Sequence, residues 1–179
     1  MDLNFLDIQK GFYDLDKINK LNYEAFPKDE RLEIDRLISL KERGLVDLKA
    51  VYDDELFVGF YSLTVYSHSV YLFFIAVEDH LRSKGYGSQI LKQLHQLYKN
   101  YQIVIDMEPV VSHADNYEQR KIRKEFYLRN LYYETHYYMT YNQMTFELLS
   151  NHSLFDKDDF IKLLDTIRLP HFQPVIYLK

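Results

Sequence analysis

The feature that most constrains the fold is an uninterrupted run of eight apolar residues, Val70–Val77. A strand that is apolar at every position has both faces covered, so we expect this run at the centre of a sheet with helices on each side. The run is far shorter than the roughly 20 apolar residues that cross a bilayer, and no membrane association is expected. The sequence therefore predicts an α/β fold built around this strand.

Two helices and two strands are predicted ahead of the central strand. Asp14 is the expected N-cap of the first helix and Pro27 ends it, while Gly44 ends the second. Alternating apolar residues then predict strands that pair antiparallel with the central one. The predicted helices cover residues 15–26 and 30–43, and the predicted strands cover residues 46–52, 56–66 and 70–77.

A second series of elements follows the central strand. Apolar residues on one helical face from Ile90 to Tyr98 predict a helix, and a short buried strand comes next. Because strand, helix and strand succeed one another, the two strands are expected to be parallel with a right-handed crossover. Asp156 is the expected cap of a last helix that ends before Pro170. The other predicted elements are a strand at 101–107, a helix at 117–130 and a hairpin of strands at 132–141 and 143–149.

Composition excludes several classes of protein. Since none of the 179 residues is cysteine, disulfide scaffolds, thiolate metal sites and cysteine nucleophiles are excluded. The seven histidines lie at least twelve residues apart, so no metal-binding spacing exists. The net charge of −5 argues against nucleic-acid binding, and an N-terminus without a signal peptide predicts a cytoplasmic protein. We expect one domain over residues 1–150, followed by a C-terminal helix and tail at 151–179 that pack on the same domain or on the partner in a homodimer.

The turn from the central strand into the next helix has the composition of an anion-binding site. Gly85 and Gly87 lie where about four backbone N–H groups lack partners and the helix dipole is positive. Glycine lets a ligand approach the backbone closely, and Arg82 and Lys84 add positive charge. By itself this spacing is equally typical of a purely structural turn. The antiparallel strands before it exclude a dinucleotide-binding fold, and no lysine follows either glycine as a Walker loop requires.

Two segments resemble motifs of the GNAT N-acetyltransferase superfamily. Arg82-Ser83-Lys84-Gly85-Tyr86-Gly87 resembles its acyl-CoA signature R/Q-x-x-G-x-G/A, and Phe126-Tyr127-Leu128-Arg129-Asn130 resembles the start of its F-Y-x-x-N-G segment. The predicted order of elements is similar to that fold from about residue 3 to residue 150. The resemblance implies a mixed, mostly antiparallel sheet with one βαβ crossover and helices on both faces.

The resemblance also implies a function. It predicts an acetyl-CoA-dependent N-acetyltransferase that moves an acetyl group to a primary amine by direct attack and uses no metal. The Val77 N–H would face the thioester oxygen, Tyr127 would be the acid that protonates the departing sulfur, and Glu108 is the candidate base. Glu108 has a second interpretation, a solvated carboxylate at a strand end. The implied cofactor-binding residues are Ile75, Ala76, Val77, Arg82, Ser83, Lys84, Gly85, Tyr86, Gly87, Ser88, Asn116 and Arg123.

Several alternatives stay open at this point. The basic residues of the 117–130 helix form either a solvated face or, as the resemblance suggests, a set that reaches pantetheine or phosphate oxygens. Where the family often has glycine the chain has Leu131, so Asn130 is expected to make the left-handed turn in its place. A non-catalytic acyl-CoA-binding or regulatory domain is the alternative function. The sequence specifies neither the amine acceptor nor the length of the acyl group.

Overall fold

The computed structural model describes residues 2–167, 169 and 172–178, so the expected helix stop at Pro170 and the last of the seven histidines, His171, lie outside the described residues. The described residues form a mixed α/β fold, as predicted, with five α-helices and a mostly antiparallel sheet in the order β1-β2-β3-β4-β5-β7-β6-β8. Two compact units make up the chain, one of residues 1–64 and 72–94 and one of residues 65–71 and 95–179. The mixed sheet and its helices agree with the predicted α/β fold class.

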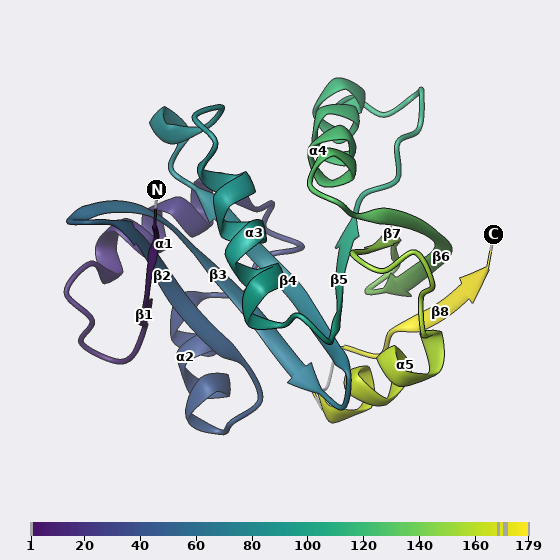
Figure 1. Cartoon of the computed structure of the whole chain (residues 1–179), viewed down its shortest axis with the longest axis horizontal. Helices are drawn as coiled ribbons and strands as arrows, with labels where there is room; N and C mark the ends of the chain where they lie inside the picture. The colour runs from purple at the N-terminus through teal and green to yellow at the C-terminus, as the bar shows by residue number, and fades with distance from the viewer. Residues whose placement is uncertain (1, 168, 170–171, 179) are drawn as a thin grey trace. The chain divides into compact units, whose positions relative to one another are not determined.

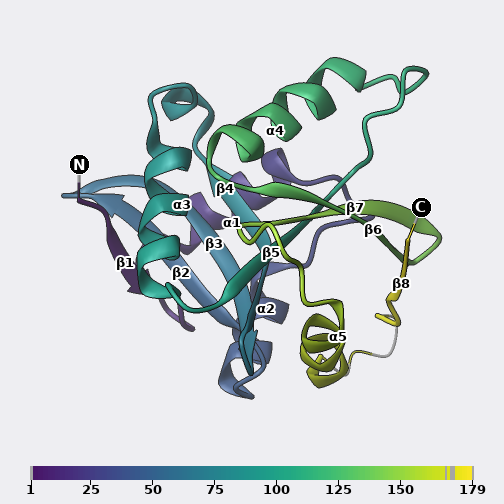
Figure 2. The same ribbon diagram turned by 45° about the vertical axis from the view of Figure 1, so that its right-hand side comes forward.

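The first unit contains the predicted central strand. Its helices lie on both faces of its strands, with α1 and α2 on one face and α3 on the other (Figures 1 and 2). Its elements are β1 (Asn4–Asp7), α1 (Leu15–Ala25), α2 (Ile34–Glu42), β2 (Asp47–Asp53), β3 (Leu56–Tyr66), most of β4 (Ser69–Val77), a 3-10 turn (Asp79–Leu81) and most of α3 (Tyr86–Leu97).

A hydrophobic cluster joins the α1–α2 layer to the strands. Ile18 and Leu21 of α1 and Leu37 of α2 are fully buried in it, because apolar residues recur at helical spacing on the inner face of each helix. Alternate residues of the strands complete the cluster, which includes Phe60 in β3. Ala76 also belongs to this cluster, so the packing holds the end of β4 in place.

The first helix starts where predicted but without the expected side-chain cap, and the second helix starts later than predicted. Asp14 is at the N-cap position of α1 but caps no backbone N–H, because its carboxylate accepts a hydrogen bond from the Tyr52 hydroxyl at 2.7 Å and pairs with Lys17 at 2.9 Å. The second helix begins at Ile34 rather than at residue 30, since Glu30 and Arg31 form a turn on the Pro27 carbonyl. The stop at Gly44 is confirmed, and its φ of 71° is the left-handed conformation that glycine favours.

The second unit contains the beginning of β4, from Ser69 to Tyr71. β4 and β5 (Gln102–Met107) are parallel, as predicted, with Tyr71 opposite Val104. The aromatic hairpin of β6 (Tyr133–Tyr141) and β7 (Met144–Ser150) adds its second strand to β5, and β8 (Val175–Leu178) pairs antiparallel with β6. α4 (Tyr117–Arg129) follows the carboxyl end of β5 (Figure 1).

The last helix, α5 (Lys157–Thr166), is capped as predicted. The Asp156 side chain accepts from the Asp159 N–H at 2.9 Å. Asp159 in turn accepts from the Ser69 hydroxyl at 2.6 Å, so the helix is tied to the first residue of β4. The β8 segment of the C-terminal tail pairs with β6 of the same chain, and packing of the tail in a homodimer stays a prediction.

Candidate active site

The predicted anion-binding turn has the backbone that a main-chain cradle needs. Ser83 and Gly85 adopt positive φ values of 61° and 89°, and α3 begins directly after them. The Gln89 N–H donates to the Gly85 carbonyl at 3.0 Å, which leaves the N–H groups of the first helical turn without a helical acceptor. A Cβ at Gly85 would meet nothing within 4 Å, so the space beside this turn is open.

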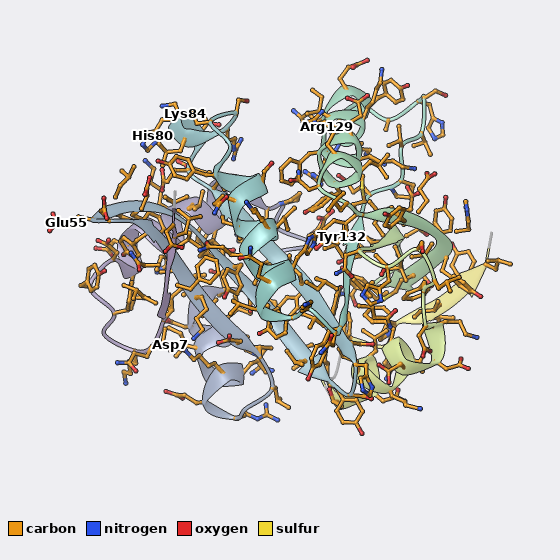
Figure 3. All side chains as sticks on the ribbon, viewed as in Figure 1. Asp7, Glu55, His80, Lys84, Arg129 and Tyr132 are labelled. Carbon is orange, nitrogen blue, oxygen red and sulfur yellow. The ribbon has the colours of Figure 1, made fainter. Side chains whose placement is uncertain are left out.

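The side chains of this turn take different directions. The Tyr86 side chain is turned into the fold, where its hydroxyl donates to Asp53 at 2.8 Å, so only its main chain faces the turn. Arg82 pairs with Asp79 at 2.9 Å, and its backbone N–H donates to the Asp79 carbonyl at 3.1 Å. The Arg82 N–H is therefore already used, and residues 83–88 are the better candidates for main-chain donors. The Lys84 side chain lies at the outer end of the same loop (Figure 3).

The end of β4 is held by an unusually close approach of two strands. Gly59 of β3 faces Ala76, and a Cβ built on it would lie 2.0 Å from the Ala76 carbonyl oxygen. Beyond Val77, the Glu78 N–H donates to the Val58 carbonyl at 2.9 Å. Ala76 and Val77 are thus held by backbone contacts, and Ile75 directly precedes them in the strand. No sequence motif pointed to Gly59, although a glycine inside a strand is itself a signal for close backbone approach.

In the second unit, Tyr127 lies on α4 with 7% of its surface exposed. Its ring meets Tyr132 at a centroid distance of 5.5 Å. Burial raises the pKa of Tyr127 to about 12, with Arg123 lowering it and Asp106 raising it further. The hydroxyl therefore keeps its proton at neutral pH, as an acid must before it donates.

Both carboxylate oxygens of Glu108 accept hydrogen bonds from side chains at the start of α4. Arg120 donates to one carboxylate oxygen at 2.7 Å and Asn116 donates to the other at 3.1 Å, while Arg123 is 3.7 Å away. Glu108 and Arg120 are each 18% exposed in their side chains. Of the predicted residues the structure brings Glu108, Asn116 and Arg123 together, but it uses Asn116 to hold Glu108.

The basic helix is only partly a solvated face. Lys124 pairs with Glu147 at 2.8 Å and with Glu134, and Arg120 pairs with Glu108. Burial alone would lower the pKa of Lys124, but the two carboxylates outweigh it and raise that pKa above its ordinary value. Arg123, with 42% of its side chain exposed, keeps more freedom to meet a ligand.

The turn after α4 differs from the expectation. Asn130 has an ordinary φ of −97° and its side chain donates to the Phe126 carbonyl at 2.7 Å. Leu131 itself takes the left-handed conformation, with φ of 66°. The chain thus keeps the turn geometry that glycine would give at this position, although a leucine occupies it.

This strain predicts a stabilising substitution. Leu131→Asn is expected to raise the free energy of unfolding by about 1 kcal/mol, because asparagine tolerates the left-handed region and Leu131 is 66% exposed, so little burial is lost. Denaturant unfolding measures the change. Leu154→Asn, at a leucine that is 87% exposed and has no positive φ, is the control and is expected to change stability by less than about 0.5 kcal/mol. Equal effects would contradict the strain argument.

Sequence reasoning missed one polar group in this unit, Asp106 on β5. Its carboxylate accepts from the hydroxyls of Tyr71, at 2.9 Å, and Tyr141, at 3.0 Å. Burial raises the pKa of Asp106, and the two hydroxyls offset part of that rise. The available signal was a carboxylate that follows the three apolar residues Ile103, Val104 and Ile105 in a buried strand.

Two other features are absent from the described residues, a membrane-spanning helix and a metal-binding cluster. No helix in this part of the chain combines the length and the apolar character needed to cross a bilayer. No group of three or more histidine, cysteine, aspartate or glutamate side chains is arranged to hold a metal ion, again within the described residues.

Comparison with known proteins bears on the same elements. The family model described as the acetyltransferase (GNAT) family matches residues 11–121. No curated protein matches the chain significantly. Among solved structures, a protein from Bacteroides thetaiotaomicron assigned to the GNAT family is 26% identical, with a TM-score of 0.74 over 92% of this chain and 97% of its own.

Two more distant structures share the fold and hold a ligand. The PaiA N-acetyltransferase from Thermoplasma acidophilum, in complex with coenzyme A, is 12% identical with a TM-score of 0.60 over 84% of this chain and 98% of its own. A GNAT family acetyltransferase from Elizabethkingia anophelis, with acetyl-CoA bound, is 14% identical with a TM-score of 0.55 over 83% of this chain and 96% of its own.

Proposed function

Because the chain belongs to the acetyltransferase (GNAT) family, we propose that it binds acetyl-CoA and transfers the acetyl group to a primary amine by direct attack. The observation that carries the proposal is the turn of residues 83–88, where left-handed backbone at Ser83 and Gly85 opens onto the start of α3. Helix starts with free N–H groups bind phosphate, and the diphosphate of CoA has the matching charge. Related folds hold CoA or acetyl-CoA.

In this proposal the first unit binds the donor. Main-chain donors of residues 83–88 hold the diphosphate, with Lys84 adding charge. Main-chain groups of Ile75, Ala76 and Val77 bind the pantetheine arm, and the Val77 N–H donates to the thioester oxygen as negative charge develops there. A fixed donor of this kind typically lowers a barrier by about 3 kcal/mol. The rigid backbone contact between Gly59 and Ala76 supports this role, because a preorganised donor must not move.

The second unit supplies proton transfer. Acetyl-CoA brings an activated thioester; Tyr127 gives its proton to the sulfur as the carbon–sulfur bond breaks. Burial raises the pKa of Tyr127 to about 12, which supports this assignment only in that the hydroxyl carries its proton at neutral pH and is available to donate it. Arg123 is the α4 side chain proposed to meet the cofactor. The base predicted from the sequence is Glu108, whose carboxylate accepts hydrogen bonds from Arg120 and Asn116.

An assay for released thiol tests the proposed function. The protein is incubated with acetyl-CoA and a panel of amines that includes polyamines, aminoglycosides, amino acids and a lysine peptide, and acetylated products are identified by mass. We expect amine-dependent thiol release with one of these classes. Binding of acetyl-CoA without release in any of them would support the alternative, a non-catalytic acyl-CoA-binding domain. Propionyl-CoA in parallel defines the length of the acyl group.

A further inference from the structure

A half-buried carboxylate in the second unit, Asp106, has no cationic partner among the described residues. Asp106 lies on β5 between Tyr71 of β4 and Tyr141 of β6, and each of its oxygens accepts from one phenol. Within the part of the chain that the structure describes, no lysine, arginine or histidine forms an ion pair with it. Three strands thus converge to hold one negative charge with neutral donors alone.

Two other carboxylates of this unit, Glu108 and Glu147, have cationic partners. Glu108 is held by Arg120 at 2.7 Å and Glu147 by Lys124 at 2.8 Å. Both pairs tie a carboxylate to α4, and the Glu108 and Arg120 side chains are each 18% exposed. Glu108 is therefore suited to fixing the start of α4.

Asp106 differs from Glu108 in that it has no cationic partner among the described residues. Taking up a proton relieves its burial without breaking any ion pair, and it keeps partial exposure to solvent. The titratable groups that act on it or respond to it are Tyr71, Tyr141 and, from α4, Tyr127. A carboxylate whose pKa is raised is a stronger base than an ordinary aspartate.

We propose that Asp106, held between the hydroxyls of Tyr71 and Tyr141, is the catalytic residue that accepts the proton of the acceptor's ammonium group. The inference rests on the proposed function and assigns the acceptor to cationic amines. The nitrogen–hydrogen bond breaks and an oxygen–hydrogen bond forms on Asp106, so that the nitrogen keeps its electron pair and attacks the thioester carbon.

Tyr127 and Asp106 together account for every proton transferred in the reaction. The new carbon–nitrogen bond forms as the carbon–sulfur bond breaks, and Tyr127 gives its proton to the sulfur. The second proton of the attacking nitrogen returns to the Tyr127 oxygen. Asp106 releases its proton to solvent, so that each turnover yields an amide, a thiol and one proton.

The test is the pH dependence of kcat/KM with an amine that the wild-type protein acetylates. Asp106→Asn is expected to lower kcat/KM by about 10²-fold to 10⁴-fold and to remove the acid limb, with the dissociation constant for acetyl-CoA unchanged. Tyr141→Phe keeps the ring that stacks on Phe146 but removes one donor to the carboxylate, so it should shift the acid limb to higher pH.

Asp159→Asn is the matched control, because Asp159 is also a buried carboxylate of this unit that accepts from hydroxyl and backbone donors. It is expected to lower the melting temperature and leave the acid limb at its wild-type position. An acid limb that persists in Asp106→Asn, or that stays in place in Tyr141→Phe, would overturn the inference while leaving acetyl transfer by the wild-type protein intact. A wild-type protein that binds acetyl-CoA but acetylates no amine would overturn the proposed function and this inference with it.

Discussion

Gly59→Ala is expected to cost about 3 kcal/mol of stability. The new Cβ would lie 2.0 Å from the Ala76 carbonyl oxygen and 2.9 Å from its carbonyl carbon, and both atoms belong to a backbone that cannot rotate away. Overpacking a well-filled site typically costs about 1–3 kcal/mol, and a backbone neighbour places this case at the upper end. Denaturant unfolding measures the loss.

A second glycine separates steric from conformational effects. Gly44 has φ of 71° and open space where a Cβ would be added, so Gly44→Ala should cost only about 1–2 kcal/mol, for the left-handed backbone. Gly59 has no positive φ, so its cost is purely steric. If Gly59→Ala were no more destabilising than Gly44→Ala, the close approach of β3 and β4 would be refuted. In folded Gly59→Ala protein, acetyl-CoA affinity should fall, because the end of β4 must move.

Tyr127→Phe is expected to lower kcat by about 10²-fold to 10⁴-fold and to leave the dissociation constant for acetyl-CoA nearly unchanged. The substitution removes only the hydroxyl proton that the proposal gives to the thiolate. Since the pKa of Tyr127 is about 12, the wild-type acid stays protonated, and no alkaline loss of activity from this group is expected until pH approaches that value. Steady-state kinetics and a binding titration provide the two measurements.

Tyr132→Phe is a close control for Tyr127→Phe. Tyr132 is 2% exposed and stacks edge-on against Tyr127, and its hydroxyl has no hydrogen-bond partner among the described residues. Removal of the Tyr132 hydroxyl should leave kcat within a few-fold of wild type. It should also preserve or raise the free energy of unfolding, because an unpaired buried hydroxyl is unfavourable. Equal losses of kcat in the two variants would refute a specific role for the Tyr127 proton.

Local patterns predicted most of the fold. The apolar run of β4, the helical spacing in α3 and the Asp156 cap each depend on near neighbours in sequence, and all three are confirmed. The short strands β1 and β8 were missed because their residues are largely exposed and gain their pairing only from distant partners. The Asp14 cap failed for the same reason, since the Tyr52 hydroxyl competes for the carboxylate.

The candidate site was predicted unevenly. The glycine turn and Tyr127 belong to contiguous motifs, which a sequence displays directly. Asp106 depends on two tyrosines that lie 35 residues away on either side, and no spacing rule brings them together. Leu131 shows a further limit, because the surrounding structure forces it into a conformation that its own preferences oppose.

Thermal unfolding with and without acetyl-CoA tests the central claim most directly. At about a hundred times the dissociation constant, a ligand that binds only the folded state adds roughly 2.7 kcal/mol, which corresponds to a rise in Tm of about 5–11 °C for a chain of this length. ADP at the same concentration is the control for the adenine and diphosphate groups. The account predicts a shift of this size with acetyl-CoA and a much smaller one with ADP. No shift with acetyl-CoA, or an equal shift with ADP, would contradict it.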